Sequence, residues 1–253
     1  MTRLNVAVVA TLALIGPVSA WAHGENADPI GTDAAPFGPP VDDRRVYVHA
    51  LLDEFEYRAT GSASVSRWEG EAWIGTDSNR LWLKSEGEID RHGNVKEGLH
   101  EVLFDRPITS YFDVQAGLRY DLDSAAGRAW GALGVEGLAP HFLRLSATLY
   151  ASDGGHVAAK AKASYDLLLT QRLIVQPSLE MNAYTREDAP RRIGSGISSI
   201  DAGLRLRYEV TRKFAPYVGL AYQRAFSSTA LFIRQAGESD KNFSVLIGVR
   251  SWL

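Results

Sequence analysis

The sequence contains no cysteine, so neither a disulfide framework nor thiolate-based metal or redox chemistry is available to it. Its formal charge of -3 provides no basic excess, which argues against a nucleic-acid binder. Beyond the N-terminal region, no segment approaches the roughly 18 consecutive apolar residues of a membrane-spanning helix. Hydropathy alone therefore resembles that of a soluble protein, although a β-barrel spreads its apolar residues over every second position and escapes such a scan.

The first residues have the pattern of an export signal. Arg3 precedes an apolar run over residues 4–18, and Ala20-Trp21-Ala22 fits the small-x-small cleavage rule. We predict a signal peptide over residues 1–22, which leaves His23 as the mature N-terminus. A buried N-terminal helix is the alternative, and the proline- and glycine-rich sequence that follows disfavours it.

Residues 23–42 form a separate compositional segment. It holds four prolines and three glycines and has too little apolar surface to offset the entropy cost of ordering. We predict a disordered periplasmic tether over 23–42, followed by one β-domain over 43–253.

The clearest predicted strand covers residues 111–121. Its apolar and polar side chains alternate with period two, which is typical of a strand with two different environments. Phe112 and Tyr120 end the apolar face and lie about 26 Å apart at ~3.3 Å per residue. That spacing suits an apolar membrane band bounded by aromatic residues.

The same alternation recurs along the whole domain and predicts twelve antiparallel strands, in which apolar residues face lipid and charged residues face the lumen. Short turns alternate with longer connections, among them 185–195 and 227–241, as in outer-membrane barrels of even strand number. The predicted strands are 46–58, 66–75, 80–90, 95–105, 111–121, 128–137, 142–150, 157–167, 173–184, 198–210, 214–226 and 242–253.

A soluble β-sandwich or a lipocalin-like barrel is the competing architecture. Its apolar face would point inward, and the alternation would read identically in the sequence. The export signal, the paired aromatic residues, the unequal loops and the long strands favour the membrane barrel.

Several ordered segments resemble the bacterial copper resistance protein B family, and the resemblance spans roughly residues 43–253. The segments that carry it are 72–82 (AWIGTDSNRLW), 86–88 (EGE), 112–121 (FDVQAGLRYD), 165–177 (YDLLLTQRLIVQP), 194–208 (GSGISSIDAGLRLRY) and 213–219 (KFAPYVG).

The resemblance implies a Gram-negative outer-membrane protein of copper tolerance that works with a periplasmic multicopper oxidase. Members of the family typically carry a methionine- and histidine-rich tether, because thioethers favour Cu(I) and imidazole suits Cu(II). This tether has no methionine, and Met181 is the only methionine beyond Met1. A second departure is the last residue, Leu253, where such barrels commonly end in an aromatic residue.

Copper ligands must therefore come from histidines and carboxylates. Lumen-facing residues of the first, third and fourth strands are the main candidates, although lumenal charges also pair simply to fill a narrow barrel. His100 and Glu101 are adjacent and so point to opposite faces. The candidate ligands in the barrel are His49, Asp53, Glu86, Glu88, His100 and Glu101.

His23 is a separate candidate. A mature N-terminal histidine offers its amine and its ring nitrogen to Cu(II), unless its position after the cleavage site is chance.

We expect no enzyme activity, since no nucleophile signature such as G-x-S-x-G in a supporting context is present. The sequence predicts an outer-membrane barrel that binds copper and contributes to copper resistance by sequestration or export. Its partners would be membrane lipid, copper ions and the oxidase. The alternative is a general diffusion or structural barrel without a metal site.

Overall fold

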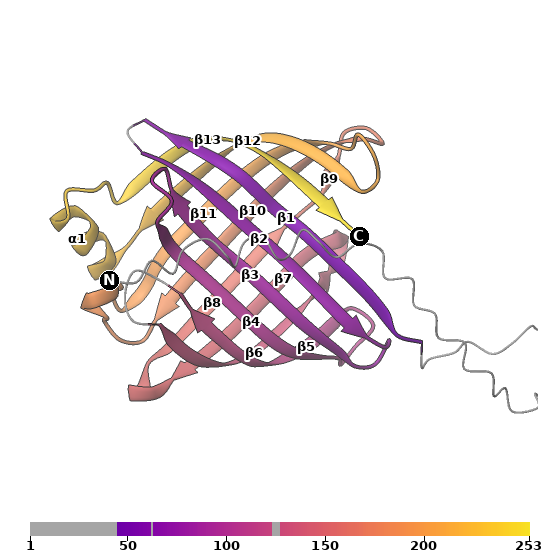
Figure 1. Ribbon diagram of the computed structural model, residues 1–253, viewed down its shortest axis with the longest axis horizontal. Helices are drawn as coiled ribbons and strands as arrows, with labels where there is room; N and C mark the ends of the chain where they lie inside the picture. Colours follow the sequence, from indigo (N-terminus) through magenta and orange to yellow (C-terminus); the bar gives the residue numbers. More distant parts are fainter. Residues whose placement is uncertain (1–44, 62, 123–126) are drawn as a thin grey trace, which may run out of the picture. The chain divides into compact units, whose positions relative to one another are not determined.

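A computed structural model describes residues 45–61, 63–122 and 127–253. The predicted signal peptide and tether lie outside these residues. The described chain forms a closed antiparallel β-barrel in which successive strands pair along the sheet and β11 pairs with β10 to complete the circle (Figure 1). The strands are β1 (Tyr47–Thr60), β2 (Ala63–Gly75), β3 (Arg80–Asp90), β4 (Val95–Pro107), β5 (Phe112–Asp121), β6 (Arg128–Ala139), β7 (Leu143–Ser152), β8 (Val157–Ser164), β9 (Leu167–Leu168), β10 (Leu173–Tyr184), β11 (Gly196–Tyr208), β12 (Phe214–Ala225) and β13 (Lys241–Trp252).

The short strand β9 continues β8 rather than adding a place to the barrel. Both pair with β10: Ser178 to Tyr184 lie beside β8, and Ile174 and Val175 lie beside β9. The predicted strand 157–167 is thus interrupted for two residues, at Tyr165 and Asp166, and the barrel has the twelve strand positions that the alternation predicted.

The two faces of the wall confirm an inside-out barrel. Large apolar side chains such as Leu118, Leu149 and Ile247 are exposed on the outside, whereas Arg58 and Asp105 are almost fully buried inside. A soluble barrel would bury the first group, so this arrangement excludes the lipocalin-like alternative. Exposed aromatic residues lie near both rims, including Tyr120, Tyr222 and Phe243 at one and Phe104, Tyr208 and Phe214 at the other.

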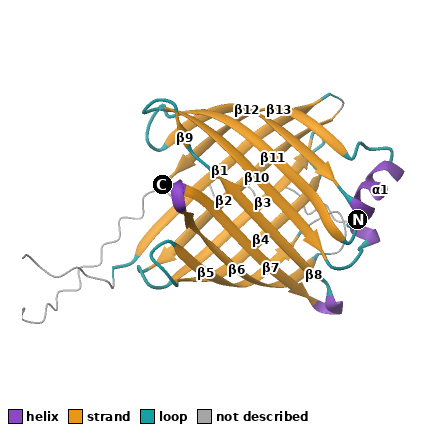
Figure 2. Cartoon of the chain, turned by 180° about the vertical axis from the view of Figure 1, so that it is seen from behind, coloured by secondary structure: helices purple, strands orange, loops and turns teal. Residues whose placement is uncertain are grey.

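The two ends of the barrel differ. The terminal end holds residue 45, Leu253 and the shorter connections, among which lies the 3-10 helix η3 (Pro140–Phe142). The loop end carries η4 (Asp153–Gly155), η5 (Ala189–Arg191) and the helix α1 (Ser227–Gln235). Figure 2 shows α1 and the C-terminus at opposite ends of the barrel. Both long connections predicted from the sequence lie at the loop end, and the second contains α1.

No helix in the described part of the chain has the length and apolar character needed to cross a membrane.

Strand β1 contains a bulge at Asp53. Its pairing with β2 shifts between Leu52 and Glu54, so one extra residue is accommodated on β1. A bulge breaks the strict alternation of faces. As a result the consecutive carboxylates of Asp53 and Glu54 both reach lumenal partners: Asp53 meets Arg250, and Glu54 meets Arg205.

Candidate functional site

Ion pairs cross the middle of the lumen between strands that are not neighbours in the sheet. Glu86 on β3 accepts hydrogen bonds from both Lys160 and Lys162 on β8, the latter at 2.7 Å. Arg67 on β2 binds Glu180 on β10 at 3.0 Å. Because these contacts span the barrel instead of following adjacent strands, they bridge its centre.

A second charged group is almost completely buried at one side of the lumen. Glu56 accepts hydrogen bonds from Arg58 at 2.7 Å, from Arg205 at 3.0 Å and from the Tyr217 hydroxyl at 3.0 Å. Arg58 also pairs with Asp201 at 2.6 Å. This group joins β1 to β11 and β12, and it compensates each buried charge with at least one opposite charge.

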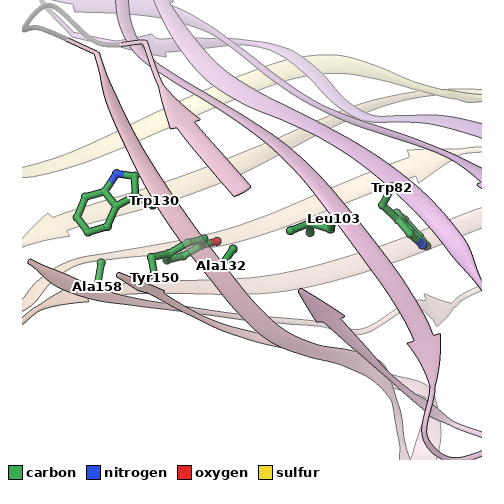
Figure 3. Close-up of a cluster of buried hydrophobic side chains, with 6 residues drawn as sticks. All are labelled: Trp82, Leu103, Trp130, Ala132, Tyr150 and Ala158. Atoms are coloured by element: carbon green, nitrogen blue, oxygen red, sulfur yellow. The ribbon is translucent and has the colours of Figure 1, made fainter. Parts of the chain in front are cut away.

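An apolar row runs along the inner wall in the hydrogen-bonding direction of the sheet. The row starts near the beginning of β1, at the terminal end, and finishes at the last residue of β10, at the loop end. It passes from one end to the other because the strands are tilted. Figure 3 shows Trp82, Leu103, Ala132, Tyr150 and Ala158 of this row together with Trp130. The successive register partners are His49, Trp73, Trp82, Leu103, Gly117, Ala132, Tyr150, Ala158 and Tyr184.

Cationic side chains cover the aromatic members of the row. The Lys84 ammonium lies 5.1 Å from the ring centre of Trp82, and the Arg119 guanidinium lies 4.4 Å from that of Tyr150. Such contacts are attractive because the ring face is electron-rich. The lumen thus combines aromatic faces with charged groups instead of a plain polar channel.

A cavity of about 450 Å3 opens in the lumen at the terminal end. Trp73 and Trp82 form one part of its wall, and charged side chains form the rest. The Glu71 carboxylate makes no hydrogen bond or ion pair with any described residue. The acidic lining residues outnumber the basic ones, five to three: Asp53, Glu69, Glu71, Asp113 and Glu136 against Arg80, Arg144 and Lys162. Four of these carboxylates are ion-paired, with Arg250, Lys162, Arg80 and Lys84, so the Glu71 carboxylate is the group that attracts a further cation.

Two predicted ligands lie at this end. His49 stands between Trp73 and Trp252, with ring centres 5.9 Å and 6.0 Å away. Asp53 lines the cavity and accepts a 2.5 Å hydrogen bond from Arg250. His49 and Asp53 are four positions apart on one strand, roughly 13 Å, so these two side chains do not share one coordination sphere.

The other predicted barrel residues are dispersed. Glu86 and Glu88 face the lumen, where Glu88 lies 3.5 Å from Arg67. Glu101 accepts a 2.7 Å hydrogen bond from the Tyr150 hydroxyl. His100 lies on the outer face of β4, in register with Tyr120, and is therefore separated from every lumenal carboxylate by the barrel wall. His23 lies outside the described residues.

Sequence reasoning missed several carboxylates that the barrel brings together. Within the described ranges, one group of three or more histidine, cysteine or acidic residues has ligand atoms within 4.8 Å of one another: Glu69, Glu86 and Glu180. Only Glu86 was predicted. Period-two alternation placed Glu180 in the lumen, but it cannot show which strands face each other across a barrel.

These features define the class of the protein: a transmembrane-type β-barrel with the fold of outer-membrane porins and a charged lumen bridged by ion pairs. The NanC porin structure is similar, with a TM-score of 0.51 and 12% identity, over 81% of this chain and 99% of that one.

The family described as "Copper resistance protein B precursor (CopB)" matches residues 46–253, and the chain belongs to it. The Copper resistance protein B of Escherichia coli is 36% identical over 85% of this chain and 72% of its own length. The Copper resistance protein B homolog of Pseudomonas syringae pv. tomato is 37% identical over 90% and 77%. Family membership supports a role in copper resistance and confirms the resemblance seen in the sequence.

Proposed function

We propose that this barrel binds Cu(II) through the terminal-end cavity and thereby sequesters copper as its part in copper resistance. The observation that carries the proposal is the cavity itself, in which the Glu71 carboxylate has no ion pair with a described residue while the other four lining carboxylates are paired. Imidazole and carboxylate oxygen suit Cu(II), whereas Cu(I) prefers the thiolates and thioethers that this lumen lacks. Met181, the only methionine after Met1, lies on the outer face.

The distance between His49 and Asp53 supports two successive stations. His49 offers an imidazole near the start of β1, and Asp53 with Glu71 offers oxygen ligands deeper inside. Each station leaves coordination positions to water, which keeps the ion exchangeable. The ion pairs of Glu86 with Lys160 and Lys162 limit further passage, which favours sequestration over free conduction.

The proposal includes an orientation. With the terminal end towards the periplasm and the loop end outside, as in outer-membrane barrels with short periplasmic turns, the cavity faces the compartment of the expected multicopper oxidase. The protein then acts as a binding partner without catalytic chemistry of its own. A mature N-terminal His23 would supply a further Cu(II) chelate through its amine and imidazole.

Calorimetric titration of the refolded mature chain with Cu(II), paired with electron paramagnetic resonance, tests the proposal. We expect His49→Ala to weaken binding about tenfold or more, with loss of nitrogen hyperfine coupling. Asp53→Asn with Glu71→Gln lowers the stoichiometry or the affinity at the second station. His100→Ala is the matched control, because it removes an imidazole from the outer face, and it leaves binding unchanged.

A structural barrel without a metal site is the second candidate, and the ion-paired centre of the lumen favours it. Equal Cu(II) binding by the parent chain and by His49→Ala with Asp53→Asn and Glu71→Gln combined would overturn the cavity site, and no Cu(II) binding by the parent chain would establish that alternative. Mass determination of the mature N-terminus decides His23 separately, because cleavage at any other bond removes the proposed amine ligand.

A further inference from the structure

Two basic residues lie directly opposite each other at the loop end of the barrel. Arg224 near the end of β12 and Lys241 at the start of β13 are register partners. They share the outer face with Tyr222 and Phe243, the next outward pair along the same two strands, whose side chains are 40% and 59% exposed. Directly opposite residues have Cβ atoms about 5 Å apart, so two like charges there repel each other.

No acidic group in the described part of the chain relieves this repulsion. Neither Arg224 nor Lys241 forms an ion pair with any described residue. The nearest acidic residue in the chain, Asp240, is held by Arg234 at 3.0 Å, and Glu238 is held by Arg192 at 3.1 Å. The Arg224 guanidinium lies 5.0 Å from the ring centre of Phe226, which fixes it beside the rim. The basic pair is therefore left without a counter-charge among the described residues, and it calls for an anion from outside the chain.

The position of Arg224 and Lys241 on the barrel wall indicates which kind of molecule carries that anion. Tyr222 and Phe243 lie two residues further into the wall, about 7 Å along the strands, and belong to the aromatic residues at the upper edge of the apolar band. A basic pair just beyond such a girdle lies at the level of lipid headgroups. It also faces the lipid and not the lumen, so the lumenal carboxylates are on the other side of the wall.

We propose that Arg224 and Lys241 bind a phosphate group of an outer-leaflet glycolipid, of the lipid A type. Arginine engages two phosphate oxygens at once, and lysine adds a compact charge to a third oxygen. Tyr222 and Phe243 pack against the first acyl carbons below the headgroup. The assignment to the outer leaflet rests on the proposed orientation, with the loop end outside; it does not depend on copper binding.

Thermal unfolding of the purified barrel in detergent tests the proposal, with and without lipid A carrying both phosphates. The double variant Arg224→Gln with Lys241→Gln removes the repulsion, so in detergent alone its Tm is equal to or higher than that of the parent. Added lipid A raises the Tm of the parent by several degrees and leaves the double variant unchanged. The parent thus has the higher Tm only when lipid A is present, which distinguishes a lipid site from a merely structural role.

Arg212→Gln with Lys213→Gln is the matched control, since it removes two exposed basic residues at the terminal end and keeps the full response to lipid A. The same Tm measurements are made with dephosphorylated lipid A and with inorganic phosphate. An equal response of the double variant to lipid A, or an equal shift with inorganic phosphate, overturns the proposal. A response to phosphatidylglycerol but not to lipid A overturns the outer-leaflet assignment, and with it the orientation, while the copper titration remains independent.

Discussion

Individual side chains in this lumen are stabilised in groups, and Glu56 shows the consequence. It is 3% exposed and accepts hydrogen bonds from two arginines and a tyrosine. Removing one member of a buried charged group leaves its partners without compensation, which costs more than the pair contributed. By contrast Glu88 makes only long contacts, at 3.5 Å to Arg67 and 3.4 Å from the Gln223 amide.

We predict that Glu56→Gln lowers the free energy of unfolding by about 3 kcal/mol, at the low end of the range for broken buried pairs because Glu54 and Asp201 also contact the two arginines. Glu88→Gln, the control, costs less than about 1 kcal/mol. Guanidinium unfolding in lipid vesicles measures both. Equal losses of unfolding free energy in the two variants would show that burial of the hydrogen-bonded group does not add to its stabilising effect.

At the scale of the element, strand alternation was the most informative property of the sequence. It predicted the limits of β3, 80–90, and placed the start of β5 one residue too early. This accuracy is possible because each strand separates lipid from lumen, so the period of two is strict. It did not predict the bulge at Asp53, the interruption between β8 and β9, or α1, which depend on contacts and not on periodicity.

The outward face of β12 gives a direct test of this element-level assignment. Leu220 is exposed near the middle of the strand, opposite Val245. We predict that Leu220→Arg lowers the free energy of unfolding in membranes by about 2–4 kcal/mol, since it places a charge in hydrocarbon. Gln223→Arg is the lumenal control, near Glu88 and Asp201, and costs less. The reverse order in vesicle unfolding would mean that the faces are exchanged.

The connection between β10 and β11 has its own pH dependence. Burial alone would raise the pKa of Asp188, but its hydrogen bond and ion pair with Arg128 and the charge of Arg191 hold that pKa below the usual value. Asp188 accepts from Arg128 at 2.6 Å. A lowered pKa means that the stabilisation is present above the ordinary value of 3.8 and is lost as the pH falls through the folded-state pKa.

We therefore predict that amide exchange of Ile193, which donates to the Asp188 carbonyl, accelerates relative to its intrinsic rate below about pH 4. Asp188→Asn removes this dependence and exchanges faster at neutral pH. A corrected exchange rate that is constant between pH 6 and pH 3 in the parent chain would contradict the prediction.

For the whole molecule, the architecture was predictable from the sequence but the interior was not. Twelve strands, their facing and the unequal loops follow from local pattern. The site depends on contacts such as Glu86 with Lys160, which join strands five places apart around the barrel. His100 illustrates the same limit: the sequence showed that it and Glu101 point to opposite faces, and only the closed barrel shows which of the two is lumenal.

The contacts that cross the lumen predict a low conductance. Lys160→Met with Lys162→Met keeps side-chain volume but removes the charges that bind Glu86 and Glu180. We expect the double variant to conduct measurably more than the parent chain in planar bilayers, because the central ties are lost. Lys213→Met at the terminal end is the control and leaves conductance unchanged. Equal currents in all three would show that these ties do not close the barrel.

The seam of the barrel has a consequence for its biogenesis. β1 pairs with β13, and the backbone of Ala50 exchanges two hydrogen bonds with that of Leu253. The first strand therefore has an unsatisfied edge until β13 has been delivered, and in hydrocarbon such an edge is prohibitively costly. Closure of the barrel must await β13, so a chain that lacks this strand is expected to be a substrate for periplasmic chaperones and proteases, not a smaller barrel.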